Sequence, residues 1–423
     1  MSSRTNKKRK SNQLESVSSL DQLSFPNQLK NTFEGKPEWI SSQNDFNNAF
    51  KIISQENIIS FDTEFIGEES FHRQLCLVQL ATQKNIFLID PLSNIDLQPL
   101  WNLIGNKSIC KIVHAGIQDL EFSIRLGGET PKNIFDTQIA AAIAGLPYPI
   151  GLSKLLPIFS KINIGNSQTL TDWKARPLSN AQVEYAANDV RFLIYLYECL
   201  TKKIKNLNRE DWLKEEFLPL ETTSHYDPPI DGHVRRLLKG KNASEETKAI
   251  MERLTKIRLE IAEFKDMPPR STLPDEVLIS LSKKRPENLE QLQLIKGYPR
   301  NLDNLFNEKI YNCFKNTEKY SKKSPKLLPA HERVLNKSKE DGIWALFCAF
   351  CFNNKIEPSF VTSRHYFQVW INENITKDCP MNSNWRKYAI ADHFRELLDG
   401  KISLKWNQEV NLLNNGKGTS TFN

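Results

Sequence analysis

Two carboxylates lie close together in the segment 58–65, whose sequence is Ile-Ile-Ser-Phe-Asp-Thr-Glu-Phe. Its β-branched and aromatic residues predict a buried strand. Because side chains alternate between the faces of a strand, Asp62 and Glu64 are expected on one side. Phe61 and Phe65 are expected on the other side, in a core. Two like charges partly removed from water are unfavourable unless a group such as Mg²⁺ neutralises them. On this segment alone, a solvated edge strand is an equally good interpretation.

The chain supplies two further acids at positions that local signals define. Asp119 lies early in a helix that is expected to follow a strand. Ser179 and Gln182 form a capping box, which predicts the start of another helix, running to about Cys199. Tyr185 and Asp189 are four residues apart in that helix, so they share one face.

Four carboxylates from three elements can surround two Mg²⁺ ions about 4 Å apart. Such a site suits phosphodiester hydrolysis, because bound metal ions lower the pKa of water and stabilise the leaving oxygen. Tyr185 would lie one turn before Asp189. A phenol is a poor base at neutral pH, so the expected role of Tyr185 is to orient the attacking water.

Composition narrows the class of protein. A chain of 423 residues predicts two or three domains, and 39% hydrophobic with 25% charged residues is ordinary for a globular protein. No apolar run is long enough to span a membrane, and the N-terminus has no apolar signal, so a cytoplasmic location without a membrane partner is expected. Only Cys348 and Cys351 have C-x-x-C spacing, inside an apolar run, which favours structural thiols over a zinc site.

Positive charge is concentrated outside the acidic segment. The net charge is +7. Lys and Arg are in excess in residues 1–35 and 206–423, whereas residues 36–205 are close to neutral. This distribution suits a metal-using centre held on a polyanion, although a basic surface without a partner gives the same count. The run Lys7–Lys10 is either a basic arm or a nuclear localisation signal.

The order of elements predicts an α/β domain followed by helices. The acidic strand, residues 76–81 and residues 85–90 are expected to form an antiparallel meander, and residues 108–114 a fourth strand. Later apolar residues follow helical spacing. The predicted organisation is a disordered basic extension (1–36), an α/β domain (37–205), a linker (206–244), a helical domain (245–319), a linker (320–330), a second helical domain (331–400) and a polar tail (401–423).

Four motifs resemble those of one known family. They are D-x-E at Asp62–Glu64, H-A-G-x-x-D at His114–Asp119, F-D-T-Q at Phe135–Gln138 and Y-A-A-x-D-V at Tyr185–Val190. They are similar to the motifs of ribonuclease D, in the tyrosine-bearing branch of the four-acid (DEDD) 3′→5′ exonucleases. The histidine branch carries its histidine at the position of Glu184, so the tyrosine branch fits.

The C-terminal half extends the resemblance. Residues 267–286, which include Met267-Pro268-Pro269 and Pro274-Asp275-Glu276, look like an HRDC domain, and residues 384–386 resemble the second such domain of bacterial ribonuclease D. The resemblance implies a ribonuclease H-like α/β exonuclease domain, a mixed sheet flanked by helices, followed by two all-α HRDC-like domains.

The resemblance also implies roles for individual residues. Asp62, Glu64 and Asp189 would hold one metal ion and Asp62 with Asp119 the other, as two Mg²⁺ or Mn²⁺ ions, with Tyr185 completing the catalytic set. Residues expected to support the site or touch the substrate are His114, Asp136 and Gln138. For His114 and Asp136 a structural role is the favoured interpretation, and for Trp173 and Arg176 packing beneath the site.

The chain departs from the family pattern at one position. Members usually have a Lys before the Ser of the segment that leads to Asp172-Trp173, whereas this chain has Asn166. A contact to a substrate phosphate is therefore weaker here or supplied elsewhere.

The resemblance implies a 3′→5′ exoribonuclease that releases 5′-mononucleotides from RNA, including tRNA precursors with 3′ extensions, and acts as a monomer. One alternative is a DNA exonuclease of the same fold. The other is a catalytically silent RNA-binding protein, against which the presence of all four acids argues.

Overall fold

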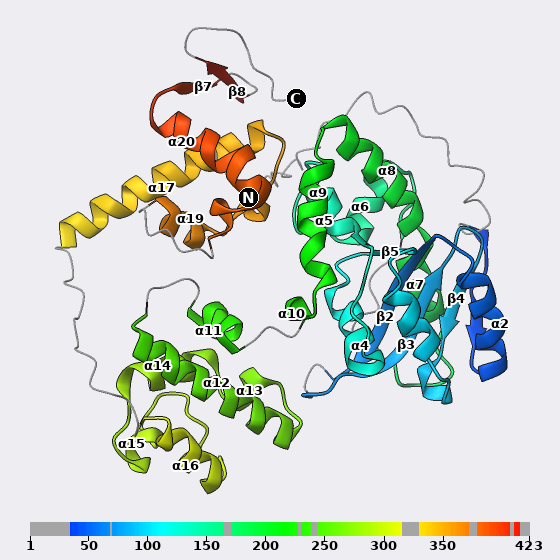
Figure 1. Ribbon diagram of the computed structural model, residues 1–423, viewed down its shortest axis with the longest axis horizontal. Helices are drawn as coiled ribbons and strands as arrows, with labels where there is room; N and C mark the ends of the chain where they lie inside the picture. Colours follow the sequence, from blue (N-terminus) through cyan, green and yellow to red (C-terminus); the bar gives the residue numbers. More distant parts are fainter. Residues whose placement is uncertain are drawn as a thin grey trace, which may run out of the picture.

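The computed structural model describes residues 34–67, 70–164, 171–226, 230–238, 243–314, 330–371, 379–406 and 410–414. The expectations for the basic extension, including Lys7–Lys10, for Asn166 and for residues 320–329 lie outside these described residues. Figure 1 shows an α/β unit and two helical units.

A six-stranded mixed sheet forms the centre of the α/β unit. The strands β2, β3 and β4 pair antiparallel, which confirms the predicted meander, and β5 and β6 extend the sheet in parallel. The short strand β1, parallel to β4, was not predicted because three residues carry too little pattern. In spatial order the strands are β1 (Glu38–Ile40), β4 (Ile86–Ile89), β3 (Gln74–Ala81), β2 (Ile58–Ile66), β5 (Cys110–Val113) and β6 (Ile134–Asp136).

Helices flank the sheet. Alternate residues of β4 pack into two different hydrophobic clusters, one for each face. Phe87 and Ile89 belong to the main core, whereas Leu88 belongs to a separate cluster that includes Ala186 of α7. The helices of this unit are α2 (Gln43–Ile53), η2 (Pro91–Ser93), α3 (Gln98–Ile104), α4 (Ile117–Gly127), α5 (Thr137–Ile143), α6 (Leu152–Phe159), α7 (Asn180–Arg191) and α8 (Leu193–Asn206).

The single helix predicted from Ser179 to about Cys199 is wrong. Phe192 leaves helical geometry, with φ −107° and ψ 0°, and separates α7 from α8. The physical reason is packing, because α7 lies against β2, β3 and β4 while α8 lies against β2, β5 and α5. The break lets the two halves join different cores.

The prediction for Phe65 is confirmed only in part, because its ring packs against the main core but stays partly exposed. The register of β2 against β3 shifts between Glu64 and Phe65, as in a β-bulge. Phe61 is buried in the core with 1% exposure, as expected. The shift leaves Phe65 only partly buried, packed on Phe122 with ring centroids 5.5 Å apart.

The first helical unit has its own core. Ile250, Leu254, Ile257 and Ile261, the residues of the predicted amphipathic stripe, are all buried in it. Part of the predicted linker 206–244 is helical instead. The elements from 206 to 314 are α9 (Glu210–Phe217), η3 (Leu218–Glu221), α10 (Thr223–Tyr226), α11 (Ile230–Leu238), α12 (Glu245–Lys265), α13 (Pro269–Thr272), α14 (Asp275–Lys284), α15 (Leu289–Gln293) and α16 (Asn304–Asn312).

The second helical unit shares a core with the α/β unit. Trp385 stacks on Trp212 of α9 with centroids 4.7 Å apart, and Arg386 pairs with Glu216. Two strands lie in the segment predicted as a polar tail. The elements are α17 (Ala330–Asn353), α18 (Pro358–Val361), α19 (Arg364–Ile371), η4 (Pro380–Asn382), η5 (Arg386–Ala391), α20 (Asp392–Leu398), β7 (Ile402–Trp406) and β8 (Val410–Asn414).

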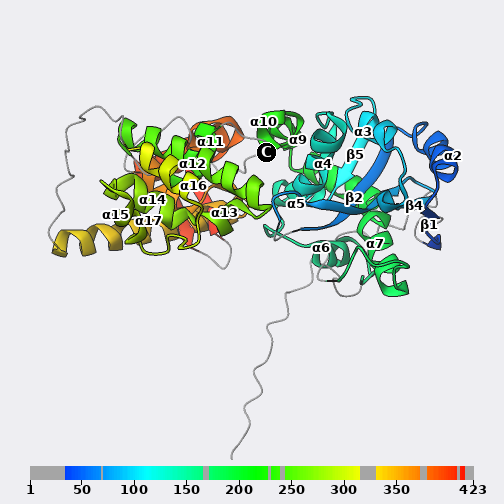
Figure 2. The ribbon, with the colours of Figure 1, turned by 90° about the horizontal axis from the view of Figure 1, so that it is seen from below.

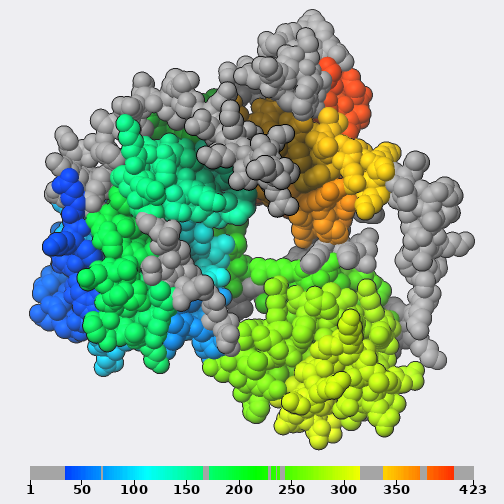
Figure 3. All heavy atoms as spheres, turned by 180° about the vertical axis from the view of Figure 1, so that it is seen from behind, coloured from blue at the N-terminus to red at the C-terminus, as the bar shows by residue number. Residues whose placement is uncertain are grey.

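The units are arranged side by side. Figure 2 shows the sheet at one end of the molecule and the helical units at the other, with α9 and α10 between them. In Figure 3 the coloured atoms of the three units lie around a central opening. Within the described residues, no helix has the length and apolar character needed to cross a membrane.

Candidate active site

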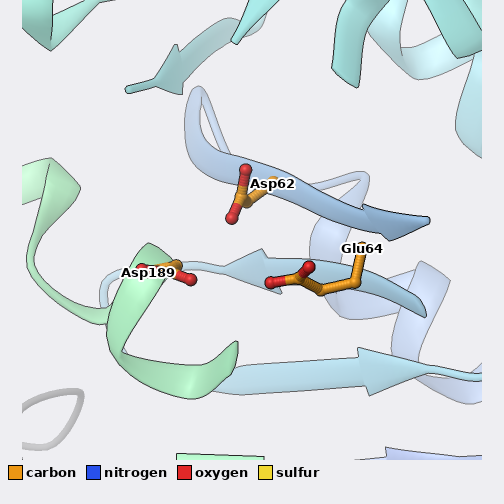
Figure 4. Close-up of side chains that lie close together, drawn as sticks. All are labelled: Asp62, Glu64 and Asp189. Carbon is orange, nitrogen blue, oxygen red and sulfur yellow. The ribbon is translucent and has the colours of Figure 1, made fainter. Parts of the chain in front are cut away.

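Three of the predicted acids converge. Asp62 and Glu64 come from β2 and Asp189 from α7, and one carboxylate oxygen of each lies within 4.8 Å of the others. Figure 4 shows the three carboxylates directed toward one another. The alternation of side chains along β2 places the first two on one face, as the sequence predicted. The third reaches them because α7 crosses that face.

Asp119 lines the same cavity but is outside this group of three. It lies in the first turn of α4 and is only 7% exposed. The hydroxyl of Thr63 donates a hydrogen bond of 2.5 Å to its Oδ1. The residue between the two strand acids therefore fixes the orientation of the fourth.

The acids lie in a cavity of about 680 Å³. Polar and apolar groups share its lining, so it can enclose both a charged and an aromatic part of a ligand. The residues that line it are Asp62, Thr63, Glu64, Phe65, His114, Ala115, Asp119, Gly151, Leu152, Ser153, Ile164, Ala181, Glu184, Tyr185, Asn188 and Asp189.

Burial raises the pKa of all four predicted acids, and repulsion from neighbouring carboxylates adds to the effect. Burial, with repulsion from Asp189 and Asp119, raises the pKa of Glu64 to about 9. The same causes hold the pKa of Asp62 well above its usual value. Burial raises the pKa of Asp119 to about 6 against the hydrogen bond from Thr63. Burial raises the pKa of Asp189 to about 7, opposed by a hydrogen bond from Tyr185.

These properties fit a divalent cation. Acidic side chains that repel one another in a half-buried cavity are stabilised when a cation neutralises them. Oδ2 of Asp189 is buried without a hydrogen-bond partner among the described residues, so it retains a free ligand atom. All donors in the set are carboxylate oxygens, the ligands that Mg²⁺ and Mn²⁺ prefer.

The helix α7 begins where the sequence predicted. The hydroxyl of Ser179 accepts from the backbone N–H of Gln182, and the Gln182 side chain accepts from that of Ser179. Trp173, which is 1% exposed, packs beneath Tyr185 with ring centroids 6.1 Å apart. The cap and this packing fix the direction of Tyr185 and Asp189.

Arg176 fastens the segment before α7 to the sheet. Its guanidinium forms two hydrogen bonds of 2.7 Å with Asp90 and one of 2.6 Å with the carbonyl of Cys76. It also donates to the carbonyls of Trp173 and Ala175. The predicted packing role of Trp173 and Arg176 agrees with these contacts.

Asp136 organises the loop that precedes Asp119. Its carboxylate accepts hydrogen bonds from the backbone N–H groups of Ala115 and Gly116, each 3.1 Å. It also caps α5 by accepting from Gln138 and the next residue. The side chain of Gln138 donates to a carbonyl of the following loop at 3.0 Å. Both residues therefore have structural partners.

His114 lines the cavity, and one of its ring nitrogens is hydrogen-bonded while the other is buried. Its Nδ1 lies 2.9 Å from the hydroxyl of Thr137, which donates its own hydrogen to the carbonyl of Val113. Nδ1 must then be the donor, and in the neutral ring Nε2 is an acceptor. Burial lowers the pKa of His114, which favours the neutral ring, and Nε2 has no partner within the described residues.

Several residues that line the cavity were not predicted as site residues, Thr63 and Phe65 among them. Thr63 was considered only as part of the strand, although its position between the acids is a usable signal. Phe65 was assigned to the core because the bulge after Glu64 has no signature in its neighbours.

Comparison with known proteins gives the class of the molecule. The family model described as 3′–5′ exonuclease matches residues 37–205, and the HRDC domain model matches residues 247–304. With the acid cluster in the matched α/β unit, the chain is a 3′→5′ exonuclease joined to an HRDC domain.

Full-length relatives define the family. Ribonuclease D of Bartonella henselae is 30% identical over 383 residues, covering 89% of this chain and 92% of the relative. Ribonuclease D of Gluconacetobacter diazotrophicus is 28% identical over 380 residues, covering 87% and 94%. The crystal structure of Escherichia coli RNase D has the same fold, with a TM-score of 0.69, 24% identity and coverage of 86% and 99%. The chain belongs to the ribonuclease D family, and its activity is that of a 3′→5′ exoribonuclease.

Proposed function

We propose that this exoribonuclease trims structured RNA such as tRNA precursors with 3′ extensions, releases 5′-mononucleotides, and uses two Mg²⁺ ions. Asp62, Glu64 and Asp189 would hold one ion, and Asp62 with Asp119 the other. The observation that carries the proposal is the convergence of the three carboxylates from β2 and α7. The Escherichia coli RNase D of the same fold is an exoribonuclease involved in structured RNA processing, which supports the substrate class.

When bound, the metal ions would supply a hydroxide nucleophile and stabilise charge on the leaving oxygen. The chain contributes orientation around them. Thr63 holds the carboxylate of Asp119 by a hydrogen bond of 2.5 Å. Tyr185 donates a hydrogen bond to Asp189, and the oxygen of its hydroxyl can accept a hydrogen bond from a water molecule and so orient it.

The test uses a 5′-labelled tRNA carrying a 3′ extension, incubated with Mg²⁺, Mn²⁺ or Ca²⁺. The expected result is stepwise shortening with Mg²⁺ that stalls near the acceptor stem, and mononucleotide products with a 5′-phosphate. A free single strand of the extension sequence and a matching single-stranded DNA are the controls. Degradation of the DNA alone would support a DNA exonuclease, and no degradation of any substrate would support a silent RNA-binding protein.

A monomeric state and a cytoplasmic location belong to the same proposal. All seven cysteines are free thiols, the state that a reducing compartment maintains. Size-exclusion chromatography with light scattering tests the monomer, for which a mass near 48.9 kDa is expected.

A further inference from the structure

Two arginines that form no ion pair with another described residue lie beside the candidate active site. Arg73 directly precedes β3, and Arg125 is in the last turn of α4. Nη1 of Arg73 is buried and has no hydrogen-bond partner within the described part of the chain. A guanidinium without an anionic partner is a vacant position for an anion.

Two aromatic rings lie between the two guanidinium groups, in a row formed by Arg73, Phe65, Phe122 and Arg125. The guanidinium carbon of Arg73 lies 5.2 Å from the ring centroid of Phe65, and that of Arg125 lies 4.8 Å from the centroid of Phe122. The two rings are in contact, with centroids 5.5 Å apart. Nη2 of Arg125 donates to the backbone carbonyl of Arg73 at 2.5 Å, which ties the ends of the row together.

This row begins at the cavity. Phe65 follows Glu64 directly at the register shift of β2, and its ring lines the cavity while it also packs against the main core. The Arg73 guanidinium covers that ring. Burial lowers the pKa of Arg125, and the positive charge of Arg73 lowers it further while Glu121 opposes the change. The two cations therefore repel each other when no anion lies between them.

We propose that Arg73, supported by Arg125, binds a backbone phosphate of the RNA strand on the 5′ side of the nucleotide being removed. A phosphate would remove the repulsion between the two cations, and the planar guanidinium is suited to two hydrogen bonds with phosphate oxygens. Stacking on Phe65 holds the guanidinium in place, so little side-chain freedom is lost on binding. The family usually has a Lys where this chain has Asn166, and Arg73 would supply from another position the phosphate contact that the resemblance implies.

The inference rests on the proposed active site, and the experiment separates the two. Arg73→Ala is compared with wild type on a single-stranded 12-nucleotide RNA and on the p-nitrophenyl ester of uridine 5′-monophosphate, which has a single phosphate. The expected result is a rise in KM for the RNA of roughly tenfold with kcat within about twofold. The ester is hydrolysed as by wild type. The salt dependence of RNA binding falls by about 0.7 in log–log slope, the contribution of one phosphate on a single strand.

Two further variants complete the test. Lys51→Ala removes one exposed positive charge from α2, none of whose residues lines the cavity, and should leave KM for RNA unchanged. Arg73→Lys keeps the charge and loses the planar fork, so part of the affinity should return. The inference is overturned if Arg73→Ala and Lys51→Ala give the same KM for RNA, or if Arg73→Ala impairs hydrolysis of the ester equally. Failure of the active-site proposal would be distinct, since Asp62→Asn would then still hydrolyse the ester.

Discussion

At the residue scale, the site stores unfavourable electrostatic energy. Glu64 is held among Asp62, Asp119 and Asp189, and burial with repulsion raises its pKa to about 9. The acids that would bind metal lower the free energy of unfolding of the protein when no metal is bound. The direction in which a substitution in the cluster changes stability can therefore be predicted.

Glu64→Gln removes one charge at constant shape and should stabilise the metal-free protein. A free glutamate has a pKa of about 4.3, so between roughly pH 5 and pH 9 the folded protein binds more protons than the unfolded chain. Stability of wild type in EDTA should therefore fall as the pH rises through this window, and the variant should fall less. Thermal unfolding in EDTA at pH 8 measures the difference, about 2–4 °C in Tm for each kcal/mol.

The control for this prediction is Glu290→Gln, which changes an exposed glutamate of the first helical unit. It should not alter the pH dependence. A Glu64→Gln variant whose Tm in EDTA falls in parallel with wild type from pH 5 to pH 9 would contradict the account of the cluster. Adding Mg²⁺ should reverse the order, because wild type then gains the binding energy of the ion.

At the element scale, local signals in the sequence predicted more than long-range ones. The capping box at Ser179 and the alternation along β2 were readable, because both depend on neighbours within a few residues. The bulge after Glu64 and the helix break at Phe192 were not, because each is set by packing against elements distant in the chain. The motif around Asp189 assigned this residue to the site, but the spacing of residues along the helix did not predict where its side chain lies in space.

The loop after β2 also makes a contact with a distant helix that the local sequence does not predict. Asp266 adopts a left-handed conformation, with φ 45°, after the end of α12. Its Oδ1 accepts hydrogen bonds from the backbone N–H groups of Phe71, at 3.1 Å, and His72, at 3.2 Å. The tip of the β2–β3 hairpin, one residue before Arg73, is thereby fastened to the HRDC unit. In Figure 1 this tip lies beside α13.

Asp266→Ala should loosen this connection. Removing a charged acceptor leaves both amides open to water, so hydrogen exchange at Phe71 and His72 should accelerate by roughly tenfold. Exchange measured by mass spectrometry on peptides spanning the loop reports the change. Glu263→Ala, on the same helix, is the matched control and should leave the exchange at wild-type rates. Equal protection in both variants would contradict the contact.

At the scale of the whole molecule, the second helical unit is part of the exonuclease core. Arg209 is 8% exposed and donates to the carbonyls of Ile143, Asn354 and Lys355, which belong to different units. The sequence predicted an α/β unit followed by helical units, but composition and spacing cannot reveal which surfaces of the units join. The stack of Trp212 on Trp385 is an example, because the two residues are far apart in the chain.

Trp385→Ala should destabilise the α/β unit. The side chain is 0% exposed, and its indole N–H donates to Glu216 at 2.7 Å, so truncation leaves a cavity and removes one hydrogen bond, while Arg386 still pairs with Glu216. A loss of about 3–5 kcal/mol in the free energy of unfolding is expected from denaturant titrations followed by circular dichroism. Leu294→Ala, at a side chain with 80% exposure, should change little. Equal effects of the two substitutions would refute the shared core.

Metal-dependent 3′→5′ cleavage at the acid cluster is tested by digestion of one RNA labelled at either its 5′ or its 3′ end, with Mg²⁺ and with EDTA, by wild type and by Asp62→Asn. Wild type with Mg²⁺ is expected to shorten the 5′-labelled strand stepwise and to release the 3′ label at once as a mononucleotide. EDTA should stop both reactions, and Asp62→Asn should bind the RNA without cleaving it. Cleavage by Asp62→Asn at the wild-type rate, or undiminished cleavage in EDTA, would show that the acid cluster is not the active site.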